Sequence, residues 1–238
     1  MSVDAEHYIG TELEVFAEAR NWKSYFASKI RPHLGANVAE VGAGIGGTTA
    51  LLSPGHGGRW LCLEPDRALL IKIEEAITRG ELPGIEARAA TLADIPSDRL
   101  FDSILYIDVL EHIEDDGGEA ARAAAHLRPG GKLIVLAPAH QWLYSPFDRA
   151  IGHFRRYTKQ SLAAAVPDEL ACVELIYLDM VGLLASAGNR FIAGSSSPSR
   201  AQIKLWDGAM VPLSRLLDRV ALHALGKSVL GVWSKRSA

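Results

Sequence analysis

The chain has 238 residues, of which 25 are basic and 28 acidic, so its formal net charge is −3. An apolar fraction of 48% with so little net charge excludes an intrinsically disordered protein. The same balance excludes a positive field over the whole chain for binding nucleic acid. Cys62 and Cys172 are too few and too far apart for a disulfide framework or a zinc site, which favours a reducing cytoplasm.

The first 34 residues are predicted to be helical and not a targeting segment. Acidic residues stand where a signal peptide needs a basic stretch, and Thr11 and Glu14 have the spacing of a helix capping box. A second helix carries Trp22 and other aromatic residues on one side and ends at Pro32. No run approaches the ~20 apolar residues that span a bilayer, so we expect a cytoplasmic protein with no integral membrane segment.

From residue 37 onward, short apolar runs alternate with helical patterns, of which Asp66–Thr78 is the clearest. The runs alternate little between polar and apolar residues, which is typical of parallel strands buried on both faces. The Arg-Pro-Gly-Gly sequence at 128–131 is predicted to separate a helix from the next strand. The five strands predicted in this region are Asn37–Val41, Arg59–Leu63, Ile85–Ala89, Asp102–Ile107 and Lys132–Ala137.

The pattern becomes less regular after residue 137. Residues 138–157 form a long loop rich in aromatic, His and Arg residues, and loops longer than ~12–15 residues are usually functional or disordered. Its aromatic content argues for order. A sixth strand at Cys172–Leu178, two helical stretches on either side of residues 194–199, and a last strand at Ser228–Trp233 follow.

These elements predict a single α/β domain over residues 1–238, built as a Rossmann-like, seven-stranded, mostly parallel sheet with helices on both faces. Because other helices already cover both faces of the sheet, the helices before the first strand are expected to form a lid over the crevice at the ends of the strands. The predicted parts are an N-terminal helical lid (1–34), a central ligand-binding core (35–180), a helical insertion (181–227) and the last strand (228–238).

The strongest motif is Glu-Val-Gly-Ala-Gly-Ile-Gly-Gly-Thr-Thr at residues 40–49, where the first strand passes into a helix. Gly42, Gly44 and Gly46 permit a tight turn and close approach of a ligand, and the helix N-terminus behind them offers free N–H groups. Gly42, Gly44 and Gly47 also match the dinucleotide fingerprint GxGxxG, and a purely structural turn is a further alternative.

Acidic residues at other strand ends narrow the choice of ligand. Glu40 at the tip of a buried strand needs a polar or cationic partner, for which an amino-acid ammonium group is suited and a pyrophosphate is not. Glu64 ends the second strand, where an acidic residue accepts hydrogen bonds from ribose hydroxyls. Asp108, Glu111 and His112 follow the fourth strand, so all these side chains are expected at one crevice.

From about residue 35 to 137 the chain resembles the class I S-adenosylmethionine (SAM)-dependent methyltransferases, through E-x-G-x-G-x-G, the acidic end of strand two and D-V-L-E-H-I after strand four. The rest is similar to a bacterial group of small-molecule methyltransferases in that superfamily. The resemblance implies SAM as cofactor, S-adenosylhomocysteine as product, and cofactor contacts from Glu40, Gly42, Ala43, Gly44, Gly46, Glu64, Pro65, Thr91, Leu92, Asp108 and Glu111. It leaves open whether Asp94 or the Leu92 amide meets the adenine amine.

Methyl transfer from a sulfonium needs positioning and, for an O–H or N–H acceptor, removal of a proton. Histidine is the natural base at neutral pH. His112 and His140 both follow strand ends at the crevice and are ranked equally as catalytic candidates. The alternative for each is that the imidazole only forms hydrogen bonds with backbone groups. A metal site from His140, Asp148 and His153 is not expected, because their spacing matches no established ligand pattern.

The remaining candidates would bind the acceptor: Tyr8, Trp22, His153, Arg155 and Tyr157. Arg155 and Arg156 could clamp an anionic group, or could instead pair with Asp148 or the acidic residues 114–116 and fix the loop. Ordinary packing is the alternative for Trp22.

The predicted activity is methyl transfer to an N or O atom of a small-molecule acceptor, by a monomer or homodimer that binds no nucleic acid. The alternatives are a nicotinamide-dependent oxidoreductase, a non-catalytic methyltransferase-like partner, and a methyltransferase with a lipid-linked or sugar acceptor. The apolar stretch 199–225 is expected in the core or lid, with a dimer contact or peripheral membrane association as alternatives.

Overall fold

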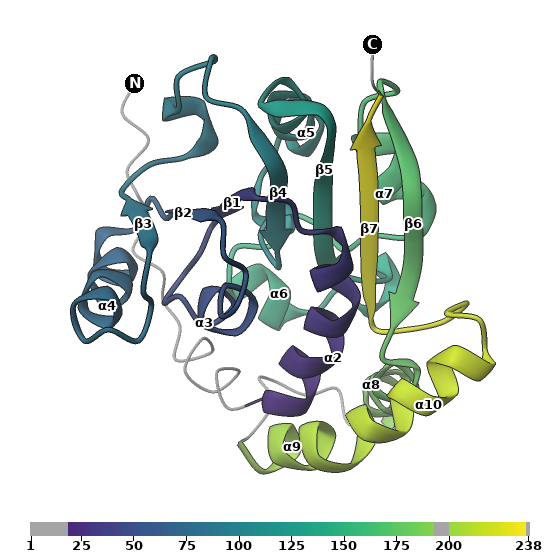
Figure 1. Cartoon of the computed structure of the whole chain (residues 1–238). Helices are drawn as coiled ribbons and strands as arrows, with labels where there is room; N and C mark the ends of the chain where they lie inside the picture. Colours follow the sequence, from purple (N-terminus) through teal and green to yellow (C-terminus); the bar gives the residue numbers. More distant parts are fainter. Residues whose placement is uncertain (1–18, 193–199, 237–238) are drawn as a thin grey trace.

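The computed structural model describes residues 19–192 and 200–236. The predicted fold class is confirmed: seven strands form one sheet in the order β3-β2-β1-β4-β5-β7-β6, and only β7 runs antiparallel to its neighbours (Figure 1). The strands are β1 (Asn37–Val41), β2 (Arg59–Leu63), β3 (Ile85–Arg88), β4 (Phe101–Ile107), β5 (Leu127–Pro138), β6 (Leu170–Leu178) and β7 (Ser228–Lys235).

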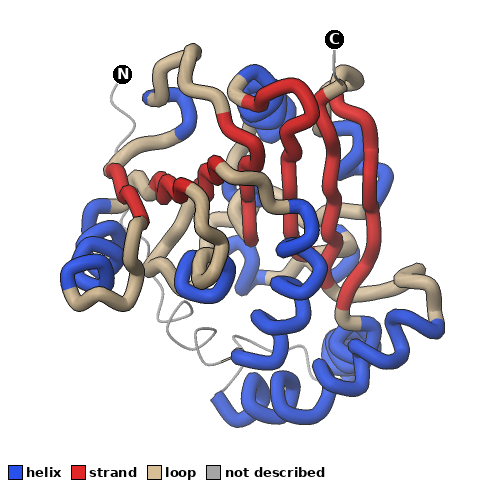
Figure 2. Tube along the Cα trace, viewed as in Figure 1, coloured by secondary structure: helices blue, strands red, loops and turns tan. Residues whose placement is uncertain are grey.

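Helices lie on both faces of this sheet (Figure 2). The α-helices are α2 (Arg20–Ile30), α3 (Thr49–Leu52), α4 (Arg67–Thr78), α5 (Asp116–Ala125), α6 (Pro146–Ala150), α7 (Lys159–Ala165), α8 (Met180–Ile192), α9 (Arg200–Leu205) and α10 (Val211–Val220). A π-helical turn (Trp206–Met210) joins α9 to α10, and short 3-10 turns lie at Arg31–His33, Leu92–Asp94, Leu110–His112 and Gln141–Leu143.

The core has two layers because successive residues of each strand point to opposite faces. In β4, Ile104 packs on the side of α5 and α7, whereas the adjacent Leu105 packs on the side of α2, α3 and α4. Both side chains are fully buried. This two-sided burial explains why the strand runs lack the polar–apolar alternation of a half-exposed sheet.

The position of α2 differs from the expectation of a lid over the sheet edge. Phe26 and Ile30 of α2 pack in one cluster with Val38 and Leu105 of the strands, so α2 covers a face of the sheet. Since α3 has only four residues, this face has room for a further helix. The predicted capping residues Thr11 and Glu14 lie outside the described residues, as does most of the segment 1–34.

The segment 128–131 also differs from the prediction, because it is part of β5 and not a stop before it. Leu127 already pairs with Phe101 of β4, and the register then shifts before Lys132 pairs with Ser103. The Pro-Gly-Gly sequence therefore produces an irregularity within a long strand.

Three buried carboxylates connect the C-terminal helices to the rest of the fold. Asp218 of α10 accepts hydrogen bonds from the Tyr25 hydroxyl of α2 (2.7 Å) and from the backbone amides of Asp179 (2.8 Å) and Met180 (2.9 Å). Asp207 accepts from the Trp22 amide (2.8 Å). Asp179 accepts from the Trp206 indole and the Ser214 hydroxyl (both 2.7 Å). These bonds fix α8 and α10 at the end of β6.

We expect Asp218→Ala to lower the free energy of unfolding by roughly 3 kcal/mol or more, because it leaves three buried donors without an acceptor. Urea unfolding followed by circular dichroism measures this loss. Asp218→Asn, which keeps one acceptor oxygen, should lose less, and Asp168→Ala at an exposed position should have almost no effect. Equal stability of Asp218→Ala and Asp168→Ala would show that the carboxylate does not hold these helices.

Candidate active site

The turn after β1 lies against the segment after β4, as the motif at residues 40–49 predicted. Gly42, Gly44 and Gly46 all have positive φ angles, of 67°, 57° and 79°. A Cβ on Gly42 would lie 2.6 Å from the Cγ2 atom of Val109, so this position excludes any side chain. The absence of a side chain at Gly42 therefore brings the ends of β1 and β4 together.

Glu64, at the end of β2, is bound to the same turn. Its Oε2 atom accepts a hydrogen bond from the Gly44 amide (2.8 Å) and its Oε1 atom accepts from the Asp66 amide (2.9 Å). Burial raises the pKa of this carboxyl, and the two amide donors counteract that rise. Each carboxylate oxygen can accept more than one hydrogen bond, so Glu64 keeps acceptor capacity for a ligand hydroxyl.

Glu40 is only 2% exposed, and its partners come from the protein itself. Its Oε2 atom accepts hydrogen bonds from the Thr49 hydroxyl (2.7 Å) and the Trp60 indole (2.9 Å). The polar partner that a buried strand-tip carboxylate requires is thus supplied by α3 and β2. Burial raises the pKa of Glu40 to about 7, although the hydrogen bonds from Thr49 and Trp60 lower it.

After the end of β3, Thr91 and Asp94 form hydrogen bonds with each other. The Thr91 amide and hydroxyl both donate to Asp94 Oδ2 at 2.8 Å, which forms a capping box for the turn Leu92–Asp94. The Leu92 side chain is fully buried, whereas Pro65 after β2 is exposed. An adenine amine donates hydrogen bonds, so of the two predicted partners the Asp94 carboxylate is the one that could accept from it, through the Oδ1 atom that these two bonds leave unused.

The residues after β4 contain a buried carboxylate without a hydrogen-bond partner. Asp108 has a positive φ of 55° and an exposed side chain. Glu111 is fully buried, and neither of its oxygens accepts a hydrogen bond. Burial and the nearby Asp108 charge raise the pKa of Glu111 well above its usual range. Such a group is costly unless it is protonated or has a cationic partner.

His112 and His153 lie beside Glu111. Their ring centroids are 4.5 Å apart, and His153 Nε2 lies 3.8 Å from Glu111 Oε1. The other His153 nitrogen, Nδ1, is 3.1 Å from Asp148 Oδ1. Burial, helped by His153, lowers the pKa of His112 to about 4, so His112 is neutral at neutral pH. Ligand atoms of Glu111, His112 and His153 lie within 4.8 Å of one another and could hold a metal ion. This is a different group from the one that the sequence analysis weighed.

His140 lies just after β5, the strand next to β4 in the sheet. Its Nε2 atom lies 3.0 Å from the carbonyl oxygen of Gly226, so this nitrogen donates and Nδ1 carries no hydrogen. The ring packs over Tyr177 with 4.8 Å between centroids. Burial lowers the pKa of His140.

Two predicted acceptor-binding residues of the loop, Arg155 and Tyr157, form contacts within the protein. Arg155 pairs with Asp116 at 2.6 Å, and Arg156 forms two hydrogen bonds with Asp148, at 2.7 and 2.9 Å. Tyr157 is 1% exposed and donates to Asp116 at 2.7 Å. These contacts support the alternative in which the arginines fix the loop, and the interpretation of Arg155 and Tyr157 as acceptor contacts stays a prediction.

Trp22 is likewise a packing residue. Its side chain is 8% exposed, and its ring lies 5.8 Å from that of Trp206 and 5.6 Å from that of Phe26. This favours the packing alternative for Trp22, and its predicted contact with the acceptor stays a prediction. Tyr8, the other predicted contact from the N-terminal segment, lies outside the described residues.

Two lysines that no sequence motif indicated also lie at this edge. The ammonium group of Lys227 lies 5.3 Å from the centre of the Trp206 ring, and the Asp108, Asp148 and Asp179 charges favour its protonated form. Burial nevertheless lowers the pKa of Lys227. Lys23 of α2 reaches the glycine turn, where its Nζ atom lies 2.9 Å from a Cβ built on Gly47.

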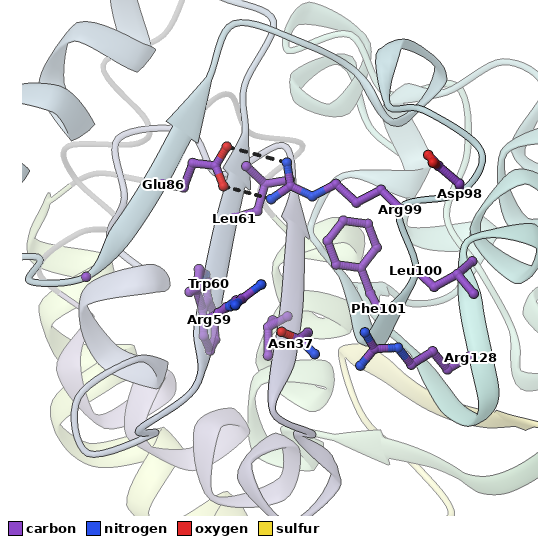
Figure 3. A pocket seen from close by; sticks show the side chains of 12 residues that line it. Asn37, Arg59, Trp60, Leu61, Glu86, Asp98, Arg99, Leu100, Phe101 and Arg128 are labelled. Carbon is purple, nitrogen blue, oxygen red and sulfur yellow. Dashed lines mark hydrogen bonds and ion pairs between the residues drawn. The ribbon is translucent and has the colours of Figure 1, made fainter.

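A cavity of about 310 Å³ lies at the opposite end of the sheet, around the amino ends of β1, β2 and β4 (Figure 3). Two of its charged side chains pair with each other, because Arg99 donates to Glu86 at 2.7 Å, as Figure 3 shows, and a third, Arg128, donates to Asp102 at 3.0 Å. None of the predicted site residues lines this cavity. The candidate site is therefore the carboxyl edge of the sheet.

Residues 39–135 match the methyltransferase domain family. A demethylmenaquinone methyltransferase of Tropheryma whipplei is 27% identical over 183 residues, which cover 72% of this chain and 70% of the relative. A ubiquinone biosynthesis O-methyltransferase of Bradyrhizobium is 26% identical over 110 residues, 45% of this chain and 42% of the relative. The structure of a geranyl diphosphate methyltransferase with SAM superposes with a TM-score of 0.64 at 15% identity, covering 98% of this chain and 93% of that one.

The raised pKa of Glu40 predicts a pH-dependent stability. Because the folded-state pKa is about 7 and the ordinary value 4.5, the folded chain binds more protons than the unfolded chain between these values. The contribution of Glu40 to stability is therefore present at low pH and is lost as pH rises from about 4.5 to 7. Glu40→Gln cannot titrate and lacks this loss.

Urea unfolding of wild type and Glu40→Gln at pH 5 and 7.5 measures the effect. The free energy of unfolding of wild type relative to the variant should fall by up to roughly 3 kcal/mol between these pH values. Glu169→Gln, at an exposed position, should have the same free energy of unfolding as wild type at both pH values. A constant difference between wild type and Glu40→Gln would contradict the assigned environment of Glu40.

Proposed function

Because the chain belongs to the class I S-adenosylmethionine-dependent methyltransferase superfamily, we propose that it transfers a methyl group from SAM to an N or O atom of a small-molecule acceptor. The observation that carries the proposal is the meeting of Gly42, Glu64 and the Asp108–His112 segment at one edge of the sheet. The glycine spacing also matched a dinucleotide fingerprint, and membership of this superfamily replaces that alternative.

The glycine turn and Glu64 would hold the cofactor, whose sulfonium supplies the electrophilic methyl group. The Gly42–Gly46 turn offers backbone without side chains for the methionine part, and Glu64 would accept hydrogen bonds from the ribose hydroxyls. Thr91 and Leu92 would border the adenine. Glu40 would act indirectly, by holding Thr49 behind the turn, because its carboxylate already accepts bonds from Thr49 and Trp60.

His140 is the better of the two candidate bases. The bond from Nε2 to the Gly226 carbonyl fixes its tautomer and leaves Nδ1 able to take a proton from the acceptor. His112 would be a weak base, since burial lowers its pKa to about 4. We therefore assign proton removal to His140, and to His112 a role in shaping the site beside Glu111.

The acceptor that best suits this edge is a flat ring with an acidic hydroxyl group. Tyr177, Trp206 and the half-exposed Trp142 supply aromatic surfaces near His140 and Lys227. The Lys227 ammonium would stabilise the oxyanion formed when the hydroxyl loses its proton. The names of the relatives, which concern demethylmenaquinone and ubiquinone biosynthesis, support an acceptor of this kind.

The two histidine assignments predict different kinetics. His140→Ala should reduce turnover by ~10²–10⁴-fold and leave SAM affinity nearly unchanged, because cofactor contacts come from the turn and Glu64. His112→Ala should have a smaller effect. Since burial lowers the pKa of His140 below its ordinary value of 6.5, the wild-type rate should decline only below that pH.

Single-turnover formation of S-adenosylhomocysteine from SAM, with a panel of catechols, hydroquinols and amines from pH 5 to 9, measures both effects. A wild-type rate for His140→Ala together with a large loss for His112→Ala would reverse the assignment. Wild-type rates for both variants would rule out a histidine base. If SAM bound but no member of the panel were methylated, the acceptor class proposed here would be wrong.

A further inference from the structure

The segment from α9 to the start of β7 exposes an unusual amount of apolar surface. Figure 1 shows α9 and α10 lying across the bottom of the molecule, beyond the carboxyl ends of β4 and β6. Six of the eleven large apolar side chains that the described residues expose belong to this segment, with exposed fractions between 47% and 85%. We call them the C-terminal apolar surface: Leu205, Leu213, Leu216, Val220, Leu222 and Leu225.

The polarity of α10 is the reverse of that of an ordinary surface helix. Its inward face carries Ser214 and Asp218, which are fully buried and accept hydrogen bonds from α8, from Asp179 just after β6 and from α2. Its outward face carries Leu213, Leu216 and Val220, at the three- and four-residue spacings of one helical stripe. A helix that directs polar groups inward and leucines outward is suited to an apolar environment outside the protein.

The charges around this surface are basic, although the whole chain has a net charge of −3. The two acidic residues between 200 and 225, Asp207 and Asp218, are buried and accept hydrogen bonds from α2. The four basic residues of the same segment are exposed or partly exposed: Arg200, Lys204, Arg215 and Arg219. The outer face of the segment is therefore both apolar and positively charged.

We propose that the C-terminal apolar surface docks onto an anionic lipid bilayer, with α10 lying in the plane of the interface. Leucines with arginine and lysine at their margin are the recognition elements of interfacial helices. The described residues contain no helix that is long and apolar enough to cross a membrane, so the contact is with one leaflet. A symmetric contact between two copies is disfavoured, because it would bring two outer faces of the same positive charge together.

Docking in this orientation also brings the candidate site to the bilayer. Trp206, in the turn between α9 and α10, packs on Lys227 at the carboxyl edge of the sheet. Under the proposed function, the acceptor would then be a lipophilic molecule that enters the site from the membrane. The docking itself does not depend on that function, and it is tested without SAM.

The test is co-sedimentation of the full chain with vesicles of phosphatidylcholine alone and of phosphatidylcholine and phosphatidylglycerol in equal parts. Wild type should sediment with the anionic vesicles, and less as salt is added. Leu216→Ser with Val220→Ser should weaken vesicle binding by about tenfold or more, since two aliphatic side chains that leave water on docking are then replaced by polar ones. Lys204→Glu with Arg219→Glu should weaken binding to the anionic vesicles specifically.

The matched control is Ile71→Ser with Val173→Ser, which removes two similarly exposed side chains elsewhere and should bind as wild type does. Thermal unfolding followed by circular dichroism checks that every variant is folded. No sedimentation of wild type with either vesicle would overturn the proposal. So would a dimer in light scattering that is lost in Leu216→Ser with Val220→Ser, because the surface would then be covered by a second copy. Unchanged SAM binding in these variants would show that a docking defect is separate from the proposed activity.

Discussion

The arrangement of the candidate site depends on the close contact between residue 42 and Val109. A side chain at residue 42 would overlap Val109, so the turn after β1 can lie against the segment after β4 only with glycine there. The same turn directs the Gly44 amide to Glu64, which adds the end of β2. One backbone constraint thus aligns three strand ends, and this edge is where open α/β sheets bind their ligands.

The C-terminal helices are held at that edge by polar contacts. Asp179, Asp207 and Asp218 accept bonds from α2, from the start of α8 and from Trp206. Because these carboxylates are satisfied inside the protein, α10 can direct polar groups inward and leave leucines outside. The same contacts set Trp206 beside Lys227, so the fold connects the outer apolar surface with the site.

The fold was predictable from sequence because each strand is an apolar run buried on both faces, a property that local residues determine. The glycine turn and Glu64 were predictable for the same reason, since both follow recognisable strands. The contacts of Arg155 and Tyr157 with Asp116 were not predictable in this way, because this partner is distant in sequence. Lys227 had no local signal: it reaches the site only because β7 inserts antiparallel between β5 and β6.

The most direct test of the site is calorimetric titration of the purified chain with SAM and, in parallel, with NAD. The account predicts micromolar binding of SAM and no comparable binding of NAD. Glu64→Ala should weaken SAM binding by at least tenfold, because a hydrogen bond to a charged acceptor contributes ~1.5–3 kcal/mol. Binding of NAD without binding of SAM would contradict the assignment of the glycine turn. Unchanged SAM affinity in Glu64→Ala would show that the ribose is held elsewhere.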